Sequence, residues 1–148
     1  MSLALYKPFV HSGPMPRAPH KEETPRSPCP VAGTLDLIGD RWTLLVVRDL
    51  FWGKTKFGEF EASPEGIPTN ILAARLQKLE RAGLVAREPY QDNPTRFAYS
   101  LTPKGRSLGP VLSGLVTWGK RNIPGTMTLE EQERAAAAPR TRKASAAP

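Results

Sequence analysis

Apolar residues recur at helical spacing within residues 66–84 and predict an amphipathic helix of about four turns. Leu72, Leu76 and Leu79 share one face, which we expect to pack on a core. Pro68 near the start and Gly83 near the end fit a helix, because proline tolerates the first turn and glycine the left-handed C-terminal position.

The opposite face of this helix carries short or amide-bearing side chains instead of the Lys and Glu that usually face solvent. These residues are Thr69, Asn70, Ala73, Ala74 and Gln77. Such a face suits a helix inserted in a DNA groove, where amides pair with adenine edges. An ordinary amphipathic core helix would explain this segment alone equally well.

Three shorter helices are predicted before it. Val31, Leu35 and Ile38 indicate a helix that ends at Gly39. The next, residues 41–52, has Asp40 as its N-cap and is apolar almost all round, so we expect it at the centre of the core. A short helix over residues 56–62, capped by Thr55, precedes a break at residues 63–66. A short helix, a tight turn and a longer helix form a helix-turn-helix.

Two strands and a final helix follow. Residues 84–88 and 96–101 are predicted to pair around a turn-rich loop at 89–95, which makes a β wing. A helix from Pro103 to Asn122, bent at Gly109-Pro110, carries one apolar stripe, formed by Leu108, Leu112, Leu115 and Trp118 and widened by Val111 and Val116. A small domain has nothing left to cover this stripe, so we expect a partner subunit there. The predicted fold class is mainly α with a small β wing: a homodimeric winged helix-turn-helix.

The basic charge is concentrated on one segment. The 148-residue chain has a net charge of +7, and residues 69–106 hold seven basic against three acidic residues. A local excess of this kind favours a polyanionic partner. Residues 1–28, rich in proline, and 126–148, rich in alanine, are expected to be mostly disordered tails around a domain at 29–125.

Cysteine content and hydropathy indicate a compartment. The single cysteine, Cys29, excludes an internal disulfide. The N-terminal residues lack the architecture of a signal peptide, and no apolar run is long enough for a membrane span. The expectation is a cytoplasmic protein with no membrane partner.

Enzymatic chemistry is not expected. The only histidines, His11 and His20, lie in the predicted tail, so neither a metal site nor a Ser/His or Cys/His nucleophile can be assembled. Gly53-Lys54-Thr55 resembles the end of a phosphate-binding loop, but position 48 holds Arg where that motif needs Gly. The prediction is a non-enzyme with no cofactor and no metal.

Four stretches then carry a family resemblance: CPVAGTLDLIGDRWTLLVVRDL, KFGEF, GIPTNILAARLQKLERAGLV and RFAYSLTPKGRSLGPVL. In this order and spacing they resemble the HxlR family of bacterial transcriptional regulators, over about residues 29–122. The resemblance implies a DNA-binding dimer of winged helix-turn-helix subunits in the bacterial cytoplasm, acting at the nucleoid. It departs from the family at Pro68, where many members have Ser followed by Pro, and at Asn93-Pro94-Thr95, where two prolines are common.

These inferences assign the site residues. Thr69, Asn70, Ala73 and Gln77 are expected to face the bases of double-stranded operator DNA; Lys54, Lys56, Lys78 and Arg81 to contact phosphates; and Arg96 to act from the wing. Lys78 and Arg81 could instead form the solvated face of a core helix, and Arg87 could pair with a carboxylate of a neighbouring strand. The dimer interface is predicted to contain Val31, Leu35, Leu108, Leu112, Leu115 and Trp118.

The signal and the rival functions stay open. Cys29 next to Pro30 matches a family feature that, in several members, implies sensing of oxidants or electrophiles; an inert small side chain is an equal alternative. One rival function is a regulator gated by a small molecule bound near the dimer interface, with Trp42 or Trp118 in the pocket. Another is a winged helix that binds proteins and not DNA.

Overall fold

The computed structural model describes residues 26–137, so most of the predicted N-terminal tail and the end of the C-terminal one lie outside the described residues. The chain divides after Leu108 into two compact units. The first contains α1 (Pro30–Ile38), α2 (Thr43–Phe51), α3 (Phe57–Glu61), α4 (Thr69–Arg81), β1 (Val85–Asp92), β2 (Thr95–Leu101) and α5 (Pro103–Arg106). The second contains α6 (Gly109–Asn122) and α7 (Leu129–Ala137).

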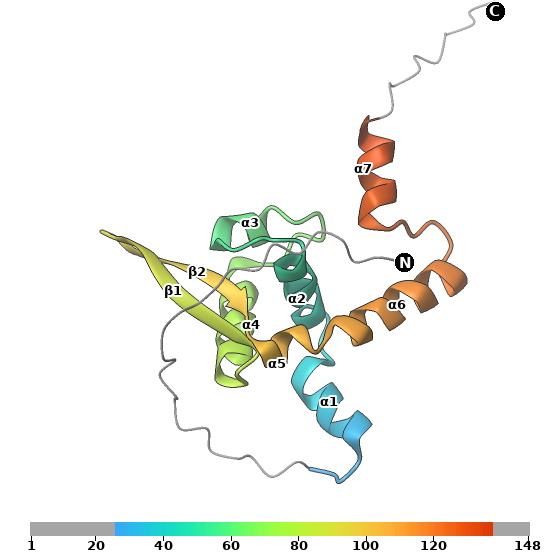
Figure 1. Cartoon of the computed structure of the whole chain (residues 1–148), viewed down its shortest axis with the longest axis horizontal. Helices are drawn as coiled ribbons and strands as arrows, with labels where there is room; N and C mark the ends of the chain where they lie inside the picture. Colours follow the sequence, from blue (N-terminus) through green and yellow to red (C-terminus); the bar gives the residue numbers. More distant parts are fainter. Residues whose placement is uncertain (1–25, 138–148) are drawn as a thin grey trace, which may run out of the picture. The chain divides into compact units, whose positions relative to one another are not determined.

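The first unit is a helical cluster with a hairpin projecting from it (Figure 1). Its core is the face of α4 formed by Leu72, Leu76 and Leu79, packed with α2 and Phe60 of α3. The sequence prediction for α4 is confirmed: Pro68 is its N-cap, and Gly83 follows it with a φ of 70°. A left-handed glycine after the helix lets the Leu84 N–H bond the Leu79 carbonyl at 3.0 Å and close the end of the helix.

The prediction for α2 is partly confirmed. Trp42 and not Asp40 is its N-cap, but Asp40 Oδ1 accepts hydrogen bonds from the Trp42 and Thr43 N–H groups, each at 3.0 Å. The helix itself begins only at Thr43, because residues 41 and 42 form a turn. Val46 and Val47 are buried as expected, but so is the charged Asp49, which the apolar pattern did not indicate.

The predicted cap of α3 is wrong. Thr55 does not cap the helix; Lys56 is the N-cap, and Glu59 Oε2 accepts from the N–H groups of Thr55 and Lys56 at 2.7 and 2.9 Å. Thr55 has another role, because its carbonyl accepts from the Tyr99 N–H of β2 at 2.7 Å. This bond holds Thr55 beside β2, and the cap falls one residue later, at Lys56.

The wing is longer than predicted. β1 and β2 form one antiparallel hairpin in which Val85 faces Leu101 at the base and Asp92 faces Thr95 at the tip. Residues 89–92, expected in the loop, belong to β1, and the register shifts between Pro89 and Gln91. A bulge of this kind takes up the irregularity at a proline without ending the ladder.

The predicted helix from 103 to 122 is two helices. α5 ends at Arg106, and α6 starts at Gly109. Pro110 explains the interruption, since it has no N–H for a bond to the carbonyl of Arg106 and its ring clashes there. In the second residue of α6 the missing N–H costs nothing. We expected a bend, and the structure has a break.

Two further contacts fix α5 at the base of the wing. Thr102 caps it by accepting from the Gly105 N–H at 3.1 Å and donates to the Gly83 carbonyl at 2.6 Å. Gly105 is required, because a Cβ there would lie 2.0 Å from the Leu84 carbonyl oxygen.

In the second unit, α7 lies within residues 126–148, the stretch that we expected to be a mostly disordered tail. Lys120 of α6 bonds Glu131 of α7 at 2.6 Å, and Thr128 with Glu131 closes the N-terminus of α7. Across residues 26–137, no helix combines the length and apolar character that a membrane span requires.

Candidate nucleic-acid interface

The outer face of α4 is exposed along its whole length. Thr69, Asn70, Ala73, Gln77 and Arg81 all lie on it, opposite the buried leucines. Short and amide side chains leave room for a close approach, and the amides can donate and accept hydrogen bonds together. Four predicted base-reading residues therefore share one accessible surface, with the cation Arg81 at its C-terminal end.

The start of this face is tied to the preceding helix. Thr69 Oγ1 lies 2.6 Å from Glu61 Oε1, and Glu61 is the last residue of α3. The contact joins the two helices of the helix-turn-helix on their exposed side. No feature of the sequence predicted it, because the two residues lie on different helices.

One flank of α4 is held by Asp40 at the junction of α1 and α2. Lys78 Nζ lies 3.6 Å from Asp40 Oδ2 and donates to the Asp36 carbonyl at 3.1 Å. Arg75 Nε is 2.9 Å from Asp40 Oδ1, but its buried N–H is not aimed at that oxygen, so the contact is an ion pair without a hydrogen bond. These pairs fix the rotation of α4 about its axis.

Asp40 is strongly acidic for a physical reason. Burial by itself would raise its pKa, but hydrogen bonds from the Thr43 hydroxyl and from the Trp42 and Thr43 backbone, together with the charge of Arg75, lower the pKa from 3.8 to about 2. Each of these donors stabilises the carboxylate over the neutral acid.

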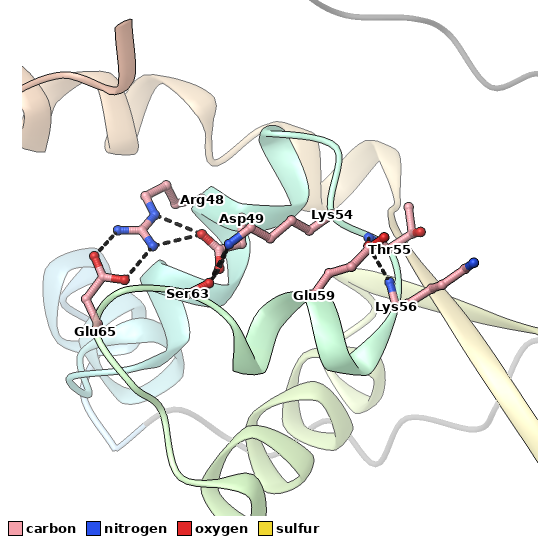
Figure 2. A network of polar contacts seen from close by, with 8 residues as sticks. All are labelled: Arg48, Asp49, Lys54, Thr55, Lys56, Glu59, Ser63 and Glu65. Carbon is pink, nitrogen blue, oxygen red and sulfur yellow. Dashed lines mark hydrogen bonds and ion pairs between the residues drawn. The ribbon is translucent and has the colours of Figure 1, made fainter. Parts of the chain in front are cut away.

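A second network fixes the turn of the helix-turn-helix (Figure 2). Asp49 of α2 accepts from Ser63 Oγ, from Lys54 Nζ at 3.1 Å and from Arg48 Nη2 at 2.8 Å. Arg48 also bonds Glu65 at 2.6 Å, and this bond lowers the pKa of Glu65. Since Ser63 and Glu65 lie in the turn between α3 and α4, the network holds both helices to α2.

The network changes the picture of Lys54. We predicted a phosphate contact, and the structure places its amine between Asp49 and Ser63. Lys78 is likewise engaged inside the chain. Their roles at DNA stay predictions, but each amine would have to leave or share an internal partner to reach a phosphate.

The remaining predicted cations lie where the wing meets α3. Lys56 Nζ is 4.9 Å from the centre of the Tyr90 ring, and Arg96 is exposed on β2. Arg87 pairs with Glu80 at 3.1 Å and stacks over Phe97, so a carboxylate on a neighbouring strand is the wrong partner, because Glu80 belongs to α4. Neither Arg81 nor Arg96 has an ion pair within residues 26–137.

The position of the wing is set by α3. Lys56 forms an isolated bridge with Ala98 of β2, next to the bond between Tyr99 and Thr55. Between α3 and the hairpin lies an open groove of about 420 Å³ whose lining includes Glu61, Arg96 and the aromatic rings of Phe57, Tyr90, Phe97 and Tyr99. The wing and the start of α4 therefore border one continuous surface.

The predicted dimer residues lie in both units. Val31 and Leu35 on α1 are 66% and 56% exposed. In the second unit Leu115 and Trp118 are 50% and 60% exposed, and Leu112 is half-buried. Leu108, at the end of the first unit, is also half-buried. Cys29, the N-cap of α1, is an exposed free thiol.

Comparison with known proteins identifies the family. The family model for the HxlR-like helix-turn-helix matches residues 37–127, more than half of the chain. The helix-turn-helix regulator Mb3122 of Mycobacterium bovis is 42% identical over 94 residues, 64% of this chain and 59% of that protein. YdeP of Bacillus subtilis is 40% identical over 93 residues, 63% of this chain and 73% of that protein. The chain thus aligns with under two thirds of Mb3122.

A solved structure agrees with the fold. The redox regulator HypR in its oxidized form superposes with a TM-score of 0.58 and 38% identity, over 64% of this chain and 97% of HypR. Both curated relatives are described as transcriptional regulators and not as enzymes. The helices, the two-stranded antiparallel sheet and these matches lead to one conclusion: the chain belongs to the HxlR family of helix-turn-helix proteins.

Proposed function

We propose that the protein is a homodimeric, sequence-specific DNA-binding regulator that inserts α4 of each subunit in a major groove. The observation that carries this proposal is the outer face of α4, exposed from Thr69 to Arg81 and composed of small and amide side chains. Its charged residue, Arg81, lies at the C-terminal end of the face. A recognition helix needs such a face, because base edges must come within hydrogen-bond distance.

Phosphate binding falls first to the cations without internal ion pairs. These cations are Arg81 at the end of α4, Lys56 at the start of α3 and Arg96 on the wing, and all three are exposed. Lys78 adds to them by exchanging the 3.6 Å contact with Asp40 for a phosphate. Lys54 contributes least, since it would have to leave the buried Asp49. Cations of this kind supply affinity, and base contacts supply specificity.

A second copy of the chain is the proposed partner for the exposed apolar residues. Val31 and Leu35 on α1, and Leu115 and Trp118 on α6, would otherwise leave large apolar side chains in water. A twofold dimer also fits DNA with two half-sites about one helical turn apart.

Cys29 is the proposed sensor of oxidants. It is exposed at the first turn of α1, where a modified sulfur would disturb Val31 and Leu35 in the proposed dimer interface. The likeness to the redox regulator HypR favours this signal over a bound small molecule. The only cysteine has no resolving partner within the chain, so oxidation would end in a mixed disulfide with a small thiol, a higher oxide of the sulfur or a bridge to Cys29 of the other subunit.

The decisive experiment is to select binding sites from random double-stranded DNA with the purified protein. We expect enrichment of a sequence with twofold symmetry, which the protein then binds at least about a thousandfold more tightly than random DNA at physiological salt. Failure to enrich any sequence, together with a monomer in sedimentation at tens of micromolar, would instead favour a protein-interaction module.

A further inference from the structure

A carboxylate stands on the surface that we propose for DNA. Glu61 is exposed at the end of α3 and lines the groove that also contains Arg96. Phosphates repel an anion, so its place among the proposed phosphate-binding cations needs a reason. The neighbouring acids have other roles, since Glu59 caps α3 and Glu80 pairs with Arg87.

The contact made by Glu61 involves the first residue of α4. Thr69 Oγ1 lies 2.6 Å from Glu61 Oε1, a typical length for a hydroxyl bonded to a carboxylate. A carboxylate has no hydrogen to give, so the hydroxyl must be the donor. Thr69 has only one hydroxyl hydrogen, and this contact uses it.

The pair therefore presents only acceptors to a ligand. Thr69 Oγ1 keeps its lone pairs, and Glu61 Oε2 has no hydrogen-bond partner within the described residues. An adjacent pair of acceptors attracts amino groups and repels carbonyl oxygens, ring nitrogens and phosphates. On the major-groove edges, cytosine offers only a donor, its N4 amino group; adenine offers N6 beside the acceptor N7, and guanine and thymine offer acceptors.

We infer that Glu61 and Thr69 together select an exocyclic amino group, cytosine N4 first and adenine N6 second, at one position of each half-site. The inference rests on the proposed function, because it requires the start of α4 to meet base edges. Glu61 then contributes to specificity, because its carboxylate weakens binding to all DNA and compensates for this loss only where the correct base is present.

The test compares the wild-type protein with Glu61→Gln and Thr69→Val in the same selection from random DNA. A Gln amide presents either an oxygen or an NH₂ group, so Glu61→Gln accepts bases of both kinds. Thr69→Val keeps the shape of the side chain and removes one acceptor. Asp92→Asn is the matched control, because it removes one exposed carboxylate from the wing, away from Thr69. Thermal melting by circular dichroism checks that all variants are folded.

We expect wild type and Asp92→Asn to enrich cytosine or adenine at one position of each half-site. Replacing that base by guanine should weaken wild-type binding about tenfold to a hundredfold, the usual range for one lost base contact. The same replacement should cost Glu61→Gln less than about threefold, and Thr69→Val an intermediate amount. Glu61→Gln should also bind random DNA more tightly than wild type does.

Two results would overturn the inference, and they are distinguishable. If Glu61→Gln keeps every base preference and gains equally on operator and random DNA, as Asp92→Asn would, then Glu61 is only a repulsive charge. The proposed function survives that result. If the wild type enriches no sequence, the proposed function fails, and the inference fails with it.

Discussion

Removing the carboxylate of Asp49 should destabilise the protein more than removing the carboxylate of Glu65, which belongs to the same network. Asp49 is 2% exposed and accepts hydrogen bonds from Arg48, Lys54 and Ser63. In Asp49→Ala these three groups stay largely shielded from water but lose the carboxylate that accepts their hydrogen bonds. The network is the link between α2 and the turn that precedes α4 (Figure 2).

The magnitude follows from what the partners can recover. Breaking a fully buried ion pair costs about 3–5 kcal/mol. Here Arg48 keeps Glu65 at 2.6 Å, and the Lys54 side chain is 26% exposed, so both cations regain part of their solvation. We therefore expect Asp49→Ala to lower the free energy of unfolding by about 2–4 kcal/mol. Glu65→Ala should cost about 1 kcal/mol or less, because that carboxylate is 35% exposed.

Urea unfolding followed by circular dichroism measures both values. The two variants are matched, since each removes one carboxylate bonded to Arg48, and a shared m-value makes the midpoints comparable. Asp49→Asn, which keeps the shape and one acceptor oxygen, should fall between them. If Asp49→Ala costs no more than Glu65→Ala, burial does not decide the strength of this network and the reasoning is wrong.

Five other variants have expected outcomes. Leu115→Asp should give monomers in sedimentation equilibrium and weaken operator binding, whereas a dimer unaffected by this change would place the interface elsewhere. Gln77→Ala should cost about 1–3 kcal/mol on operator DNA and little on random DNA in fluorescence anisotropy. Arg96→Ala should weaken binding to operator and to random DNA and lower the slope of log affinity against log salt by about one. If Gln77→Ala weakens binding to operator and random DNA equally, Gln77 does not read a base. The pKa of Asp40 is lowered to about 2, so its stabilising effect is complete above pH 4 and is lost as pH falls towards 2. Asp40→Asn should accordingly remove about 2 kcal/mol of stability at neutral pH and flatten the acid side of the unfolding profile. Finally, Cys29→Ser should abolish any change of operator affinity caused by diamide or peroxide, and an equal response in wild type and variant would exclude Cys29 as the sensor.

The elements that the sequence predicted well are those with a local cause. The spacing of Leu72, Leu76 and Leu79 gave both the helix and its buried face, and Gly83 gave its end. Asp40 was predicted to act at the start of α2, and it does accept hydrogen bonds there, because such bonds involve neighbours in the chain. The apolar repeat of α1 up to Gly39 was equally sufficient.

The errors arose where backbone pairing or a steric clash competed with propensity. Thr55 is a good capping residue, but its carbonyl accepts a hydrogen bond from Tyr99 of β2, and the cap falls one residue later, at Lys56. Residues 89–92 have the composition of a turn, and cross-strand hydrogen bonds extend β1 through them regardless. At Pro110 the clash with the preceding turn was foreseen, but whether a helix bends or breaks depends on what else holds its two parts.

By itself the sequence determined the fold of the first unit, a helix-turn-helix with a wing, together with a helix face of small and amide side chains and a local excess of positive charge. It could not say which ionic side chains were available to a ligand. In the sequence nothing distinguishes Lys54, Lys78 and Arg81. The tertiary structure pairs Lys54 with Asp49 and Lys78 with Asp40, and it leaves Arg81 without an ion pair in the described chain. The Glu61–Thr69 contact likewise needs two helices in place. Helix and turn preferences act between neighbours in sequence, whereas these pairings depend on distances that only the packed core fixes.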